Sequence, residues 1–241
     1  MRALVLAAGQ GTRLRPLTDR IPKVMVPIAG RPLLEHVVRL LALHGFDELV
    51  VNLHHCPEII REHFGDGSRF GVRITYSYEE LLRGTAGALA PVRDLFAGED
   101  FLVYYGDNLT NTDLTDLWNT HHRRGGPVTM GLIWMPDSVG RGIVGLDEDH
   151  RINRFAEKPA PDEVFEDYLI NGGIYALAPK ILDRIPRSGA CDFAQDIFPA
   201  MLADNEPLFG HHLGGELGST DTLERYQDTC RRVERGEFLL P

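Results

Sequence analysis

Short apolar runs alternate with amphipathic segments along the first 135 residues, and this alternation most constrains the fold. Apolar runs typical of buried strands occur at 2–8, 49–54, 72–78, 101–107 and 127–135. Helical spacing of apolar residues predicts helices between them, at 32–44, 57–64, 85–97 and 113–124. Alternating strands and helices indicate an α/β fold, with a doubly wound, mainly parallel, Rossmann-like sheet.

The pattern changes after residue 135. Short strands broken by a turn at 147–150 are expected within 142–158, followed by a strand at 169–179. Two helices, at about 193–204 and 220–235, complete the chain. We therefore predict a mixed sheet with a small β-rich part covering the cleft. A single domain over 1–241 is expected, with a soft division near residue 125.

Composition excludes several classes of protein. The formal net charge of −10 argues against a nucleic-acid partner, which needs a basic surface. No run approaches 18 apolar residues, so no membrane span is predicted. The N-terminus enters a strand without a basic n-region, and Cys56, Cys191 and Cys230 form no CxxC pair. We expect a cytoplasmic protein with reduced thiols.

The first strand ends in a glycine-rich loop. Gly9 and Gly11 begin a dinucleotide fingerprint, but its third glycine position is Leu14. Gly11-Thr12-Arg13 also lacks the Gly-Lys-Ser/Thr of an ATPase phosphate loop. What remains is an anion-binding loop, in which bare backbone N–H groups at Ala8, Gly9 and Gly11 would face phosphate. Arg13 and Lys23 would add a forked donor and a point charge.

The whole segment LAAGQGTRLRPLTDRIPK, followed by PIAGRPLLEH, resembles the signature of the sugar nucleotidyltransferases (nucleoside-diphosphate-sugar pyrophosphorylases). Further matching strings occur in the expected order: GTAGAL (84–89), YYGDN (104–108), RFAEKP (154–159), INGGIYAL (170–177) and GSTDTLERY (218–226). The sequence is most similar to sugar-1-phosphate guanylyltransferases. The resemblance implies a nucleotide-binding half at about 1–125 and a sugar-phosphate-binding half at about 126–241.

The implied reaction is in-line attack of a sugar 1-phosphate, or a cyclitol phosphate, on the α-phosphorus of a nucleoside triphosphate, releasing pyrophosphate. Such a protein positions two polyanions and offsets their repulsion. By motif match the catalytic residues are Arg13, Lys23, Asp107 and Lys158. The matched nucleotide-binding residues are Ala8, Gly9, Gly11, Thr12, Arg13, Glu79, Gly84 and Thr85.

The resemblance also implies Mg²⁺, with Asp107 at the end of an apolar strand as a ligand. The family's second carboxylate lies in a W-x-D-x-G-T string. The matching segment here, 214–219, reads GGELGS, so Glu216 replaces the aspartate and the tryptophan is absent. Glu216 is predicted as the second metal ligand, with a structural role as the alternative.

The nucleobase preference depends on Glu79. A carboxylate only accepts hydrogen bonds and suits the N1–H and N2–H₂ donors of guanine, whereas relatives that read uracil or thymine often carry glutamine. Glu79 favours GTP, although it could be a solvated loop acid. A UTP, dTTP or CTP enzyme with another phosphorylated acceptor stays open, as does a non-catalytic regulatory subunit that senses nucleotide sugars. A homo-oligomer is also allowed.

Four residues of the C-terminal half match positions that contact the sugar. They are Gly142, Glu157, Asn171 and Gly172, beside Lys158 as the sugar-phosphate lysine. Two alternatives stay open here. Glu157 could instead pair with an arginine, and Asn171 with its following glycines could form only a bulge.

Overall fold

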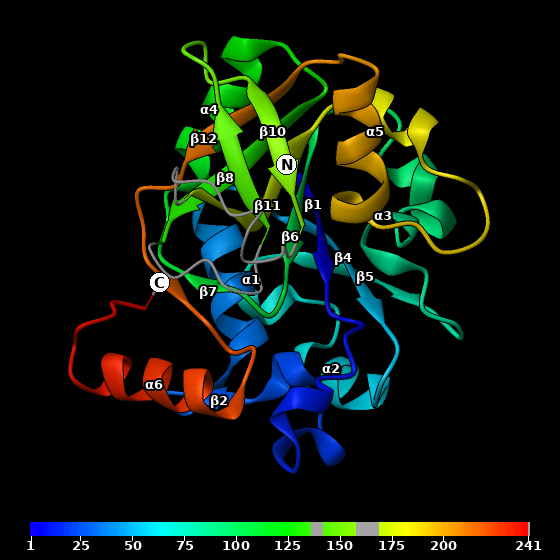
Figure 1. The fold of residues 1–241 in the computed structure, drawn as a ribbon. Coiled ribbons are helices and arrows are strands. Elements are labelled where there is room, and N and C mark those ends of the chain that lie inside the picture. The colour runs from blue at the N-terminus through cyan, green and yellow to red at the C-terminus, as the bar shows by residue number, and fades with distance from the viewer. Residues whose placement is uncertain (136–141, 158–168, 241) are drawn as a thin grey trace. The chain divides into compact units, whose positions relative to one another are not determined.

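The computed structural model describes residues 1–135, 142–157 and 169–240 (Figure 1). The chain forms two compact units. Unit 1 comprises residues 1–82, 103–112 and 215–241, and unit 2 comprises 83–102 and 113–214. The chain therefore passes between the units at four places.

A parallel sheet organises unit 1. Strand β1 (Arg2–Leu6) pairs in parallel with β4 (Glu48–Leu53), which pairs in parallel with β5 (Arg73–Tyr78). Strand β6 (Phe101–Tyr105), whose last three residues belong to unit 1, lies on the other side of β1. The strands end at one edge, because Leu6 is in register with Asn52 and accepts a hydrogen bond from Gly106 N–H.

Three α-helices belong to unit 1. Helix α1 (Leu33–Leu43) follows Pro32, α2 (Pro57–Phe64) begins with proline, and α6 (Leu223–Glu234) is capped by the Thr222 hydroxyl. Short 3₁₀ turns occur at Thr12–Leu14, Leu17–Asp19, Lys23–Met25 and Ser68–Phe70. Two-residue strands form two small antiparallel pairs, β2 (Pro27–Ile28) with β3 (Arg31–Pro32) and β7 (Leu109–Thr110) with β13 (Leu217–Gly218).

An apolar cluster joins the C-terminal helix to the N-terminal segment of unit 1. Leu14, Ile28, Leu109 and Phe238 are each at most 1% exposed, and Tyr226 of α6 packs against their cluster. The Tyr226 hydroxyl also donates to the carbonyl oxygen of Pro27 at 2.6 Å. Figure 1 shows α6 beside β2. Residues separated by about two hundred positions in sequence are thereby packed together.

Unit 2 is mixed. Strand β8 (Val128–Trp134) pairs antiparallel with β11 (Leu169–Leu177) and parallel with β12 (Leu208–His212), while β9 (Ile143–Leu146) and β10 (Ile152–Ala156) form a hairpin. Its α-helices are α3 (Gly84–Gly87), α4 (Leu114–Arg124) and α5 (Phe198–Ala203). A π turn at Phe193–Ile197 precedes α5, and 3₁₀ turns occupy Ala90–Leu95 and Pro179–Arg184.

The predicted α/β class with a mostly parallel central sheet is confirmed, and among the longer segments two differ from expectation. The helix expected at 85–97 is a single α turn followed by a 3₁₀ turn, because Pro91 removes a backbone donor. Strand β12 was not predicted, since Gly210 and two histidines hide its alternation. No helix within 1–135, 142–157 and 169–240 is long and apolar enough to cross a membrane.

Candidate active site

The glycine loop of unit 1 packs closely against Lys23. Gly11 has φ +64°, in the left-handed region that favours glycine, and a Cβ there would lie 2.8 Å from Lys23 Cβ. The Thr18 hydroxyl donates to the Gly11 carbonyl oxygen at 2.7 Å, which fixes the other side of the turn. The glycine and the lysine of the sequence motif are therefore packed against one another.

The rest of the loop is open. A Cβ built on Gly9 would meet no heavy atom within 4 Å. Gly9, Thr12 and Arg13 are exposed, whereas Ala8 is buried. The loop can therefore receive a ligand at Gly9 without displacing protein atoms, and the Arg13 side chain that follows the loop is 69% exposed.

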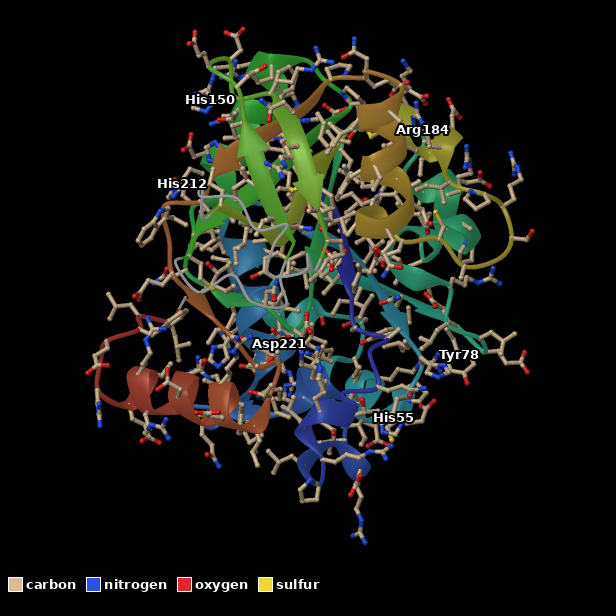
Figure 2. All side chains as sticks on the ribbon, in the orientation of Figure 1. His55, Tyr78, His150, Arg184, His212 and Asp221 are labelled. Carbon is tan, nitrogen blue, oxygen red and sulfur yellow. The ribbon has the colours of Figure 1, made fainter. Side chains whose placement is uncertain are left out.

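Lys23 lies between two carboxylates of unit 1. Its Nζ donates to Asp107 Oδ2 at 2.6 Å and to Asp221 Oδ1 at 3.1 Å. The Lys23 side chain is 8% exposed, while the two aspartates are 31% and 30% exposed. Asp221 is labelled in Figure 2, just before α6. The three side chains bring together segments that follow β1, follow β6 and precede α6.

The charge of Lys23 is maintained by these neighbours. Burial is the largest influence and acts to lower the pKa of the ammonium, but Asp107 and then Asp221 together outweigh it. The pKa of Lys23 therefore lies above its ordinary value of 10.5. Lys23 stays cationic across the neutral range, as a group that must neutralise phosphate requires.

Backbone and hydroxyl contacts hold the two aspartates in place. The Thr220 hydroxyl donates to the carbonyl oxygen of Asp107 at 2.9 Å, which ties the two segments together. The Ser219 hydroxyl donates to Asp221 Oδ2 at 3.2 Å, and Arg13 NH2 lies 3.9 Å from Asp221 Oδ1. Sequence reasoning missed Asp221, although it lies within the matched GSTDTLERY string. The available signal was an additional acidic residue in that string.

Glu216, the predicted second metal ligand, makes different contacts. Its carboxylate pairs with Arg232 NH2 at 2.8 Å and its side chain is 48% exposed. Its backbone N–H donates to Asn111 Oδ1 at 2.9 Å. Among the described residues, the two carboxylates that contact Lys23 are those of Asp107 and Asp221. These contacts agree with the structural alternative for Glu216.

Glu79 is buried at the end of β5, 2% exposed, rather than solvated on a loop. Asn52 donates through Nδ2 to Glu79 Oε1 at 2.9 Å, and its Oδ1 accepts from Ala7 N–H at 2.6 Å. His54 Nδ1 lies 2.8 Å from the Glu79 carbonyl oxygen. Asn52 was not singled out as a site residue, yet it links the start of the glycine loop to Glu79.

Gly84 and Thr85 lie in unit 2, where they contact residues 191–193. Gly84 has φ +75°, and a Cβ there would lie 2.5 Å from the carbonyl oxygen of Cys191. The Thr85 hydroxyl donates to Asp192 Oδ2 at 2.8 Å and accepts from Phe193 N–H at 2.9 Å. Both residues thus have a structural reason for their identity, in addition to the predicted nucleotide contact.

Three predicted sugar-binding residues meet in unit 2. A Cβ on Gly142 would lie 2.5 Å from Glu157 Oε2 and 3.6 Å from Asn171 Cβ. Asn171 Nδ2 donates to the Tyr175 hydroxyl at 2.8 Å, and its Oδ1 accepts from Gly173 N–H at 2.9 Å. The register of β11 on β8 shifts between Asn171 and Tyr175, so the bulge that was the alternative role of this segment is present.

Close backbone packing explains why residue 172 is a glycine, because a Cβ there would lie 2.8 Å from the carbonyl oxygen of Gly131. Lys158, the predicted sugar-phosphate lysine, lies outside the described residues.

Comparison with known proteins shows the family of this chain. The model of the nucleotidyl transferase family matches residues 2–228. The chain is 35% identical to a UTP–glucose-1-phosphate uridylyltransferase of Synechocystis sp. over 97% of its length and 63% of that protein. It is 36% identical to a mannose-1-phosphate guanylyltransferase of Mycobacterium tuberculosis, covering 87% of the chain and 58% of that protein. The chain belongs to the nucleotidyl transferase family, and the predicted resemblance to sugar nucleotidyltransferases is confirmed.

Solved structures share the fold. A UDP-glucose pyrophosphorylase complexed with UDP-glucose superposes with a TM-score of 0.84 at 17% identity, covering 98% of each chain. HddC from Yersinia pseudotuberculosis superposes with a TM-score of 0.82 at 22% identity, covering 96% of this chain and 99% of that one. The chain spans about three fifths of the length of the two curated relatives.

Proposed function

We propose that this chain transfers a nucleoside monophosphate from a nucleoside triphosphate to a sugar 1-phosphate or a cyclitol phosphate, with release of pyrophosphate. The observation that carries this proposal is Lys23, a buried cation at the open glycine loop, held by Asp107. Relatives named as uridylyltransferase and guanylyltransferase for sugar 1-phosphates support the reaction class.

The protein acts by positioning charge. The loop at Gly9 and Gly11 receives the triphosphate, with backbone N–H groups toward its oxygens. Arg13 holds the β and γ phosphates, since its guanidinium is exposed beside the loop. Lys23 bridges the α-phosphate and the incoming sugar phosphate, which offsets the repulsion between two anions. Glu157 and Asn171 bind the sugar hydroxyls, and Lys158 binds the sugar phosphate.

We propose Mg²⁺ as the cofactor. Carboxylate oxygens are the ligands that this ion prefers, and Asp107 lies beside Lys23, the cation assigned to the reacting phosphates. Asp107 fits this role, whereas the carboxylate of Glu216 is paired with Arg232. Asp107 would hold Mg²⁺, which when bound would neutralise the negative charge that develops on the phosphates.

GTP is the favoured donor. Glu79 presents only acceptors, and several relatives are named mannose-1-phosphate guanylyltransferase. UTP is the second candidate, because the Synechocystis relative is named for it. Asn52 donates to one oxygen of Glu79, so a guanine contact would have to share that carboxylate with Asn52.

The deciding experiment is a matrix of GTP, UTP, dTTP, CTP and ATP against glucose, mannose and cyclitol phosphates, with Mg²⁺ and pyrophosphate release as the readout. One pairing should exceed the others in kcat/KM. Lys23→Ala and Asp107→Ala should each lower kcat/KM on that pairing by about 10³-fold, because each removes fixed charge at the reacting phosphates.

Lys180→Ala is the matched control, since Lys180 is an exposed lysine of unit 2 outside the proposed site. Wild-type turnover in both site variants would contradict the catalytic scheme. Tight binding of nucleotide sugar without any pyrophosphate release would favour the regulatory alternative.

A further inference from the structure

The environment of Lys23 contains a second acidic residue that the motif match did not assign. Asp221 Oδ1 lies 3.1 Å from Lys23 Nζ, on the same ammonium that Asp107 Oδ2 contacts at 2.6 Å. The Lys23 side chain is only 8% exposed, so water competes weakly with the two aspartates for its N–H donors. Lys23 is thus oriented from two sides.

We propose that Asp221, rather than Glu216, is the second carboxylate of the catalytic centre, where it acts as a positioning residue for Lys23. This inference rests on the proposed function for its catalytic meaning. The orientation of Lys23 by Asp107 and Asp221 does not depend on which substrates are used.

Local contacts support this role for Asp221. The Ser219 hydroxyl donates to Oδ2, which directs Oδ1 toward Lys23. The Thr220 hydroxyl binds the Asp107 backbone, so neighbouring residues of one segment hold both carboxylates at the lysine. The Thr229 hydroxyl of α6 donates to the Ser219 carbonyl oxygen at 2.9 Å and anchors this segment to the helix.

Charge complementarity extends the argument. Arg13 lies 3.9 Å from Asp221 Oδ1, and Arg225 lies 4.0 Å from Oδ2. Within the described residues Asp221 therefore lies among three cations, Lys23, Arg13 and Arg225, of which the first two are assigned to phosphate. Glu216, by contrast, lies at the far end of β13 from these groups and pairs with Arg232.

Asp221→Asn tests the proposal, because asparagine keeps the size of the side chain and removes its charge. With the preferred substrates, kcat should fall by about 10²-fold, as expected for a misplaced reacting group, while KM for the triphosphate changes by less than about threefold. Asp221→Glu should recover part of the loss. Glu216→Gln and Asp228→Asn are the controls, and both should retain kcat.

A second readout follows Lys23 without turnover. The sequence has only three lysines, so acetylation of each can be followed by mass spectrometry of its peptide, with Lys180 as internal reference. Loss of one charge-assisted contact should raise the Lys23 acetylation rate by about tenfold in Asp221→Asn and leave it unchanged in Glu216→Gln. If the asparagine variant is unstable, the Lys23 acetylation rate is measured in Asp221→Ser instead.

These readouts separate the two proposals. Faster acetylation of Lys23 without turnover on any substrate would support the contact and reject the proposed function. Wild-type kcat and wild-type Lys23 reactivity in Asp221→Asn would overturn the inference while leaving the proposed function intact. A loss of kcat in Glu216→Gln that exceeds the loss in Asp221→Asn would restore Glu216 as the second carboxylate.

Discussion

At the scale of residues, two glycines of one loop have different reasons to be glycine. Gly11 is constrained by the protein, through its φ of +64° and the approach of Lys23 Cβ to 2.8 Å. Gly9 is outside the left-handed region, and its surroundings are open to 4 Å. Its lack of a side chain therefore serves the approach of a ligand, under the proposed function.

This difference predicts that alanine at the two positions affects different properties, stability at Gly11 and substrate binding at Gly9. Gly11→Ala should lower the free energy of unfolding by about 1–3 kcal/mol, because alanine must adopt a strained φ and displace Lys23. Gly9→Ala should change stability by less than about 0.5 kcal/mol. It should instead raise KM for the triphosphate, since a methyl group would face the phosphates. Urea unfolding and steady-state kinetics of both variants check this, and equal losses of stability would contradict it.

Sequence reasoning identified Lys23 and Asp107 because each lies in a motif with a distinctive neighbour, Pro22 or Gly106. The structure brings these two together at 2.6 Å. Asp221 and Asn52 could not be found in this way. Asp221 is 198 residues from Lys23 and precedes a helix, where an acid is common as a cap. Asn52 lies within an apolar strand, and only the folded chain reveals its contact with Ala7.

At the scale of elements, helix α1 carries a buried acid on its first turn. Glu35 accepts from Arg39 Nε and pairs with His63 of α2, both at 2.9 Å, and its side chain is 9% exposed. Burial is the largest influence and acts to raise the pKa of Glu35, but His63 and Arg39 together lower it below its ordinary value. Glu35 thereby links α1 to α2 through the hydrogen bond between its carboxylate and His63.

A carboxylate with a lowered pKa stabilises the fold above its unfolded pKa, and this contribution is lost as pH falls through the folded value. Glu35→Gln should therefore cost about 1–3 kcal/mol at pH 7, the value of hydrogen bonds to a charged group. The difference from wild type should shrink as pH falls below about 4, where the unfolded carboxyl is protonated. Urea unfolding at several pH values measures this.

Glu58→Gln is the control for this prediction, because Glu58 is an exposed acid of α2 whose side chain is 68% accessible. Its effect should be within about 0.5 kcal/mol at every pH. A difference between Glu35→Gln and wild type that does not shrink below about pH 4 would show that Glu35 stabilises the helices by shape and not by charge.

Elements were predicted best where apolar periodicity was strong, as in α1 and β4, whose bounds agree with expectation to within one or two residues. The short pairs β2–β3 and β7–β13 were not predicted, since two-residue strands carry no periodicity. Their partners are specified by tertiary packing. Leu109 of β7, for example, belongs to the buried cluster beneath α6.

At the scale of the whole molecule, the order of segments along the chain differs from their grouping in space. Unit 1 needs residues 103–112 and 215–241, which carry Asp107, Asp221 and the buried Phe238. A division near residue 125, suggested by the change of sequence pattern, would separate Asp221 and α6 from the strands they support. Sequence pattern reports local structure, whereas this grouping depends on contacts between distant segments.

The fragment 1–125 should therefore fail to fold on its own. It lacks α6 and Phe238, which leaves the cluster of Leu14, Ile28 and Leu109 exposed to water, and it carries residues 83–102 and 113–124 without the rest of unit 2. Circular dichroism with urea should show no cooperative transition for this fragment, and a mixture with fragment 126–241 should regain part of it. A cooperative transition of fragment 1–125 alone would mean that its strands form a sufficient core, and that α6 contributes the position of Asp221 without contributing to folding.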